Sequence, residues 1–130
     1  MSVHVSTDAP IDVVDVTDQV REELPDVDRG VCTVFVEHTT AAVSINEAEP
    51  RLLDDVEAFV GELSAAEGWH HDTIDDNADA HLRSSLLGRD VSVPIRDGDL
   101  ALGTWQSILL IECDGPRDRS VSVTVTEAVD

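Results

Sequence analysis

Histidine carries much of the potential chemistry of this chain, because a neutral imidazole can bind a metal ion or transfer a proton. Four of the five histidines lie in two regions: His38 in a polar break between predicted strands, and His70, His71 and His81 in a polar loop and the predicted helix that follows it. Three imidazoles from separate elements can hold a divalent ion such as zinc and leave a position for water or substrate. No two of them have the His-x3-His spacing of a helical metal motif, so ordinary hydrogen-bonded histidines remain the alternative.

The segment around His38 is unusually polar for a predicted strand. Largely apolar, strand-forming residues occupy 31–36 and 41–45, and the residues between and after them bring an imidazole, hydroxyls, an amide and carboxylates. A strand that only had to be buried would not need these groups, since each requires a hydrogen-bond partner. The sequence therefore predicts one wall of a site, formed by Glu37, His38, Thr39, Thr40, Asn46 and Glu47.

A second polar group has helical spacing. Residues at i, i+4, i+7 and i+11 share one face of a predicted helix over 77–87, and here they are Asn77, His81, Ser84 and Gly88. An exposed face in this acidic chain would carry carboxylates, so small polar groups suit a cleft better. The alternative is a face that packs on another subunit. The adjacent stripe is predicted to be buried and comprises Ala78, Leu82, Ser85 and Leu86.

The third polar group is the sequence GTWQ at 103–106, inside an apolar run. Gly103 indicates a bulge or a close approach of the backbone. Trp105 is expected to pack in the core or in an interface rather than to stack on a ligand. Gln106 is difficult to bury without a hydrogen-bond partner.

Charge sets limits on the class of protein. The 130 residues include 28 acidic residues and 8 basic ones, all of them arginine, which gives a net charge of −20. Disorder is the alternative for an acidic chain, but 42% of the residues are apolar and their regular pattern runs nearly end to end. The composition indicates a folded protein with an acidic shell, suited to a high-salt cytoplasm where salt screens self-repulsion. It argues against a nucleic-acid partner, which would require a basic patch.

No segment predicts export or membrane insertion. The N-terminal residues lack a basic region followed by an apolar run, and no apolar segment approaches the length that spans a bilayer. Cys32 and Cys113 stand among apolar, strand-like residues and are expected to be small buried hydrophobic residues. We expect a soluble, cytoplasmic protein without a membrane partner.

The fold class follows from the order of elements. Hairpin-like strands predominate over alternating strand–helix units, and Asp97-Gly98 is typical of a tight turn between strands. This pattern predicts one compact α+β domain over 1–130 with a mainly antiparallel sheet or sandwich. Strands are predicted over 2–6, 11–16, 31–38, 41–46, 91–95, 100–113 and 120–128, and helices over 17–24, 50–63 and 77–87.

Several motifs together resemble the YjbQ-like family. They occur in the order HTTAAVSINEAEP from residue 38, WHHD from residue 69, NADAHLRSSLLG from residue 77, and VSVPIRDGDLALGTWQSILLIECDGPR from residue 91. The resemblance covers nearly the whole chain. This family is identified with secondary thiamine-phosphate synthases, which join an aminopyrimidine diphosphate to a thiazole phosphate and release pyrophosphate.

The resemblance implies an α+β homotrimer and a set of site residues. The implied catalytic residues are His38, His71, His81 and Glu47, and the three histidines are also the implied ligands of a divalent metal, zinc in some members. Together with the helical stripe, the resemblance gives as substrate-binding residues Thr39, Thr40, Asn46, Asp72, Asn77, Thr104, Trp105 and Gln106. Diphosphate chemistry would require Mg²⁺ or arginines, for which the candidates are Arg83, Arg117 and Arg119.

Two functional hypotheses follow. In the first, the protein is a transferase acting on a small phosphorylated or heterocyclic substrate, with the histidines holding a metal or acting as acid and base. In the second, it is a non-catalytic homotrimeric binding or structural protein whose histidines lie in subunit interfaces.

Overall fold

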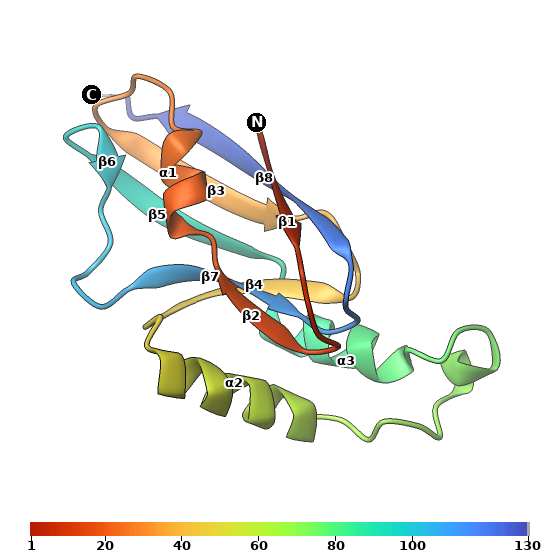
Figure 1. Cartoon of the computed structure of the whole chain (residues 1–130). Coiled ribbons are helices and arrows are strands. Elements are labelled where there is room, and N and C mark those ends of the chain that lie inside the picture. Colours follow the sequence, from red (N-terminus) through yellow and green to blue (C-terminus); the bar gives the residue numbers. More distant parts are fainter. Residues whose placement is uncertain (130) are drawn as a thin grey trace.

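Two antiparallel sheets pack against each other to form the body of the molecule (Figure 1). The computed structural model describes residues 1–129. The five-stranded sheet has the order β1 (Ser2–Ser6), β8 (Asp118–Glu127), β3 (Gly30–Val36), β5 (Asp90–Arg96) and β6 (Asp99–Leu100). The three-stranded sheet has the order β2 (Asp12–Asp15), β7 (Ser107–Glu112) and β4 (Ala41–Asn46).

Two of the helices cover the outer side of the three-stranded sheet. The described helices are α1 (Thr17–Glu22), α2 (Pro50–Glu62), the 3-10 helix η1 (His70–Thr73) and α3 (Ala78–Leu87). The outer face of that sheet packs with Val60 of α2 and Ala80 of α3, while its inner face packs on the larger sheet. The chain therefore has three layers, and the predicted α+β class with antiparallel pairing is confirmed.

The burial patterns follow from these layers. Strand β7 has helices on one side and a sheet on the other, so its residues from Ile108 to Glu112 are all buried. Strands β1 and β3 are covered on one face only and alternate between buried and exposed residues. This is the difference expected between a strand packed on both faces and one packed on a single face.

Two predicted strands are shorter than expected because the chain crosses between the sheets. The run 100–113 divides into β6 in one sheet and β7 in the other, with 101–106 as the connection. Gly103 and Gln106 close this connection: the Gly103 N–H donates to Gln106 Oε1 at 2.8 Å, and the Gln106 N–H donates to the Gly103 carbonyl at 3.1 Å. Gly103 thus belongs to a turn, not to a bulge in a strand.

The second shortened strand is β3, which ends at Val36 instead of continuing to His38. Residues 37–40 carry the chain from the five-stranded sheet to β4 in the other sheet. The connections 7–11 and 113–117 also pass between the sheets, and the strand registers place all three at the same end of the molecule. The polar break seen in the sequence is therefore a crossing point between sheets.

The apolar stripe predicted for α3 is wrong in part. Ala78 is buried as expected, but Leu82 and Leu86 are exposed, at 42% and 69%. The helix instead buries the Arg83 side chain, which donates to the carbonyls of Val60, Gly61 and Ser64 near the end of α2. Satisfying those terminal carbonyls fixes the orientation of α3 against α2.

Three further expectations can be compared with the structure. Cys32 and Cys113 are buried and free, as predicted, and burial raises the pKa of both thiols. Trp105 is 73% exposed in the chain, so the prediction that it packs in the core is wrong. Among the described helices, none is long and apolar enough to cross a membrane.

Replacing two glycines with alanine should change the stability of the fold in opposite directions. A Cβ at Gly30 would lie 2.3 Å from the Thr126 carbonyl oxygen of the paired strand, so Gly30→Ala is expected to lower the free energy of unfolding by about 1–3 kcal/mol. A Cβ at Gly61 would make an ordinary 3.5 Å contact with Ile11 inside α2, so Gly61→Ala is expected to add about 0.5–1 kcal/mol. Denaturant unfolding in high salt measures both, and equal stability of Gly30→Ala and wild type would contradict the prediction.

Candidate functional site

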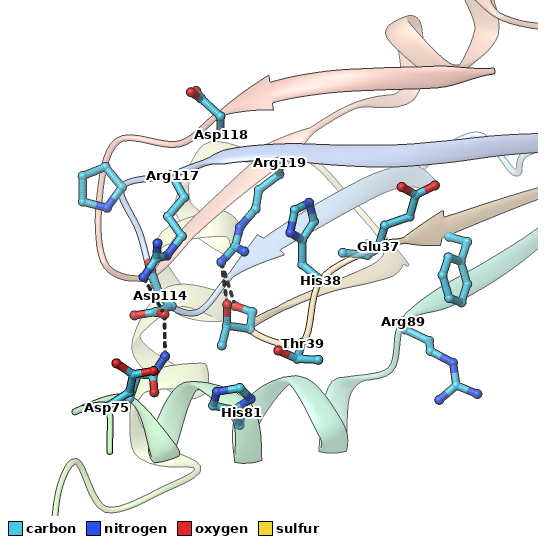
Figure 2. Close-up of a pocket in the computed structure, with 15 residues that line it drawn as sticks. Glu37, His38, Thr39, Asp75, His81, Arg89, Asp114, Arg117, Asp118 and Arg119 are labelled. Carbon is cyan, nitrogen blue, oxygen red and sulfur yellow. Dashed lines mark hydrogen bonds and ion pairs between the residues drawn. The ribbon is translucent and has the colours of Figure 1, made fainter. Parts of the chain in front are cut away.

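A cleft with a volume of about 1060 Å³ opens at the end of the molecule where the chain crosses between the sheets (Figure 2). Its walls come from residues 35–40, the start of α3, and the segment from Asp114 to Arg119. The lining residues are Phe35, Val36, Glu37, His38, Thr39, Thr40, Asp75, Asn77, His81, Arg89, Asp114, Pro116, Arg117, Asp118 and Arg119.

A buried ion pair lies at the base of this cleft. Arg119 is 3% exposed and Glu112 is fully buried. The Arg119 Nε donates to Glu112 Oε1 at 2.8 Å, and Nη2 pairs with Oε2 of the same carboxylate. The Thr7 hydroxyl donates to Oε1 at 2.6 Å, and Arg119 Nη2 also donates to Thr40 Oγ1 at 2.9 Å. This network, the Arg119–Glu112 network, joins both sheets to two of the crossing segments.

The network determines the protonation of its carboxyl group. Burial alone would raise the pKa of Glu112, but hydrogen bonds from Arg119, Thr7 and the Asp114 backbone outweigh it and hold that pKa below its usual value. Glu112 is therefore a carboxylate at neutral pH, and its charge is compensated locally by Arg119.

The His38 ring is fixed by the backbone of β8. The Ser120 N–H donates to His38 Nε2 at 2.9 Å. Burial lowers the pKa of His38, and the nearby Arg119 cation lowers it further, while Glu112 and Glu37 oppose them. His38 is therefore neutral at pH 7.

His71 and His81 pack together behind this wall. Their ring centroids are 4.8 Å apart and their planes are inclined by 80°. His81 lines the cleft, whereas His71 Nε2 is buried and lacks a hydrogen-bond partner among the described residues. The imidazole that faces a ligand on this side is His81.

Asp72 and Asn77 have clear structural partners. Asp72 accepts from the backbone N–H of Trp69 at 3.1 Å and of Ala78 at 3.2 Å, so it ties η1 to the start of α3. The Asn77 side-chain amide donates to Asp114 at 2.9 Å, and its Oδ1 is buried without a partner in the described chain.

The three histidines do not form a metal-ligand set as they are placed. The His38 Nε2 lone pair already accepts from the Ser120 N–H, and a metal would need that lone pair or a deprotonated Nδ1. Within residues 1–129, no cluster of three histidine, cysteine or acidic side chains has an arrangement that could hold an ion.

The remaining predicted site residues lie elsewhere. Glu47, Thr104 and Trp105 line a second hollow, of about 330 Å³, together with residues such as Ala48 and Ser107. The neighbouring side chains of Asn46 and Gln106 bond to backbone N–H groups in their own turns. Strand β4 separates this hollow from Thr40, and its six residues span about 20 Å. A substrate molecule bound in the cleft of one chain therefore cannot also contact the residues of the second hollow in that chain.

Some cleft residues were not predicted from the sequence. Arg89, Asp75 and Asp114 line the cleft, while Arg83, a predicted diphosphate ligand, is buried against the end of α2. The one sequence signal that could have drawn attention to Arg89 was the scarcity of basic residues, of which the chain has only 8. The Arg89 carbonyl accepts from the Val36 N–H at 2.8 Å, but the Arg89 guanidinium group has no hydrogen bond or ion pair with any described residue, and the residue is exposed.

Comparison with known proteins gives a consistent result. The chain matches the family described as "UPF0047 protein YjbQ-like" over residues 1–128. A UPF0047 protein of Archaeoglobus fulgidus is 46% identical over 124 residues, covering 95% of this chain and 98% of the relative. One from Methanothermobacter thermautotrophicus is 42% identical over 122 residues, covering 92% and 85%.

Solved structures agree closely with this fold. A YbjQ-like protein of unknown function from Sulfolobus solfataricus superposes with a TM-score of 0.95 at 39% identity, covering 98% of this chain and 96% of that one. A hypothetical protein from Aeropyrum pernix gives a TM-score of 0.94 at 43% identity, covering 98% of both chains.

The Arg119–Glu112 network predicts a large effect of a small change. Glu112→Gln leaves Arg119 buried beside a neutral group, so the free energy of unfolding should fall by on the order of 3 kcal/mol. The matched control is Arg21→Gln, which removes ion pairs with the exposed Asp18 and Asp99 and should change stability little.

The same change should alter the pH dependence of stability. Because the folded pKa of Glu112 lies below the unfolded value of about 4.5, its stabilisation is present above that pH and is lost as the pH falls through the folded pKa. Urea unfolding at several pH values should therefore show wild type and Glu112→Gln converging in acid. A constant difference at all pH values would contradict this assignment.

Proposed function

Since the chain belongs to the UPF0047 YjbQ-like family, we propose that it is a small-molecule transferase of the secondary thiamine-phosphate synthase type. It would join an aminopyrimidine diphosphate to a thiazole phosphate in the cleft and release pyrophosphate. The proposal extends beyond family membership, and its support is the chemistry of the cleft.

The observation that carries the proposal is the gathering of cations in one cleft of an acidic chain. Three of the 8 basic residues, Arg89, Arg117 and Arg119, line it, although the net charge is −20. Arg117 pairs with Asp114 at 3.1 Å and Arg119 with Glu112, while Arg89 is available. Cations of this kind would stabilise the charge that develops on a departing diphosphate.

The acidic lining residues point to a role for Mg²⁺ brought in with the substrate. Glu37, Asp75 and Asp118 lie around the same cleft and would repel a bare diphosphate. Mg²⁺ commonly binds through one or two carboxylates and the phosphates of its substrate. In the proposed reaction, His81 is the imidazole available for proton transfer, and Thr39 and Asn77 position the substrate.

A resident divalent metal, with zinc as the expected ion, is a separate proposal. His71 and His81 lie close enough together to be considered as two of its ligands. His38 would have to break its bond with Ser120 to become the third, and the present placement does not support that.

We also propose that the chain assembles as a homotrimer through the outer face of the five-stranded sheet. On the outer face of this sheet the strand registers place the carboxylates of Asp90 beside Phe35 and of Asp118 beside Ser6, both toward the end where the cleft opens; we call the rest of this face across β1, β8, β3 and β5 the carboxylate-free face. It consists of Ser2, His4, Val31, Thr33, Phe35, Ser92, Pro94, Ser120, Ser122, Thr124 and Thr126. In a chain of charge −20, contact through such a face limits like-charge repulsion to the few carboxylates at its margin.

The trimer would also give a role to the second hollow. Glu47, Thr104 and Trp105 cannot reach the cleft of their own chain, so they could act on its ligand only from a neighbouring copy. We propose a high-salt cytoplasm as the setting, because screening there lowers the repulsion between acidic subunits.

The alternative function is a non-catalytic homotrimeric binding protein. The observation in its favour is that His38 accepts a backbone hydrogen bond and that His71 packs on His81, which are structural roles. In that case the cleft would bind a ligand without turning it over.

The trimer proposal makes a prediction about Phe35, which is 38% exposed on the carboxylate-free face. Phe35→Asp places a carboxylate in the proposed interface and should shift the protein to monomers. Phe59→Asp is the matched control, because Phe59 is 61% exposed on α2, away from that face. Size-exclusion chromatography with light scattering in high salt distinguishes the species, and a monomeric wild type or a trimeric Phe35→Asp would refute the proposed interface.

The enzyme proposal makes a prediction about Arg89. Arg89→Ala should weaken pyrophosphate binding about tenfold, the effect of losing one charged hydrogen bond, as measured by calorimetry in high salt with Mg²⁺. Arg51→Ala is the control, since the Arg51 side chain is 93% exposed on α2. Wild-type protein should also form thiamine phosphate from the two precursors. Binding of the ligand without turnover would favour the alternative function, and absence of both would exclude the enzyme proposal.

A further inference from the structure

The hydrogen bond that holds His38 also fixes which of its nitrogens carries the proton. The donor is the backbone N–H of Ser120, which cannot act as an acceptor, and the distance to Nε2 is 2.9 Å. Nε2 must therefore present its lone pair. A neutral imidazole has one donor and one acceptor nitrogen, so the proton is on Nδ1.

The Nδ1 side of the ring is open to a ligand. Nδ1 has no hydrogen-bond partner within the described chain. It is also not one of the buried atoms without a partner, so solvent or a ligand can reach it. His38 lines both the cleft and a smaller hollow of about 280 Å³ beside α3, and both spaces are also bounded by His81 and Arg89. A donor on Nδ1 thus faces a space that already contains a free guanidinium group.

The surroundings keep this ring neutral. Protonation of Nε2 would set two N–H groups against each other at Ser120. Burial and the Arg119 cation also disfavour the imidazolium form, and they outweigh the carboxylates of Glu112 and Glu37. Because the charge of Glu112 is already compensated by Arg119, little negative potential remains to attract a proton.

We propose that His38 is a fixed neutral hydrogen-bond donor, through Nδ1–H, to an oxygen atom of the ligand in the cleft. This role excludes His38 as a metal ligand and as a general base, because Nε2 is occupied and Nδ1 keeps its proton. The identity of the ligand group as a phosphate oxygen rests on the proposed function. The protonation state of His38 does not.

The first test is direct observation of the tautomer. Long-range proton–nitrogen NMR spectra of the full-length protein, labelled at histidine, should show a His38 ring with a protonated Nδ1 and a bare Nε2 at neutral pH. His38→Gln identifies the signal by removing it, and His70→Gln, a change at an exposed histidine outside the cleft, should leave it in place. A protonated Nε2, a doubly protonated ring, or loss of the pattern on adding zinc would overturn the proposal.

The second test uses two amide side chains that imitate different nitrogens. The amide N–H of an asparagine takes the place of Nδ1–H, whereas that of a glutamine takes the place of Nε2. His38→Asn should therefore bind pyrophosphate within about threefold of wild type, and His38→Gln should bind about tenfold more weakly. If His38 served only to accept from Ser120, the glutamine amide oxygen would replace Nε2 and His38→Gln would bind at least as well as His38→Asn. Equal losses, or a smaller loss in His38→Gln, would therefore overturn the donor role.

The two proposals can fail separately. If wild-type protein does not bind pyrophosphate, the proposed function fails, while the NMR pattern still decides whether His38 is held as a neutral donor. If pyrophosphate binds and the two His38 variants behave alike, the proposed function stands and the donor role of His38 fails.

Discussion

The buried pair of Arg119 and Glu112 is the interaction on which the arrangement of the site depends. Moving two charges out of water is costly, and that cost is offset only when their remaining donors and acceptors are satisfied. Here Thr7 and Thr40 provide those partners, and they belong to two of the segments that pass between the sheets. An apolar pair of similar volume could fill the space between the sheets. It could not direct these two segments, because it would offer no directional bond to either hydroxyl.

The polar interruptions in the sequence follow from the same constraint. A chain that leaves one sheet for another must give up its ladder hydrogen bonds, and its free backbone and side-chain groups then need other partners. Residues 37–40 find such partners in β8, through His38, and in Arg119, through Thr40. Residues 103–106 find theirs within their own turn. Both segments look like broken strands in the sequence. Only the first becomes part of the large cleft, because the crossing segment 113–117 meets it there.

The sequence was informative about elements and less so about how they come together. Hydrophobic periodicity predicted the α+β class, the helix beginning at Pro50 and the polar wall at His38, since these depend on local patterns. The strand predicted over 41–46 already implied about 20 Å between Thr40 and Glu47. The periodicity could not show which crossing segments would meet Thr40, because that depends on which strands pair. The buried stripe of α3 was predicted wrongly for a similar reason: the carbonyls at the end of α2 select Arg83 for burial, and that contact is not visible in the periodicity of α3.

The charge of the whole chain and the direct contacts in the cleft act over different distances. The field of a chain with charge −20 opposes the approach of an anion, but at about 1 M salt it is screened within roughly 3 Å. Direct contacts with Arg89 and with a neutral imidazole donor are shorter than or similar to that length, so salt weakens them much less. A hydrogen bond from neutral His38 also adds no charge that would need compensation beside Arg119. In the high-salt cytoplasm that we propose, the cleft could therefore select an anion by contact while the remaining surface stays acidic enough to keep the protein dissolved.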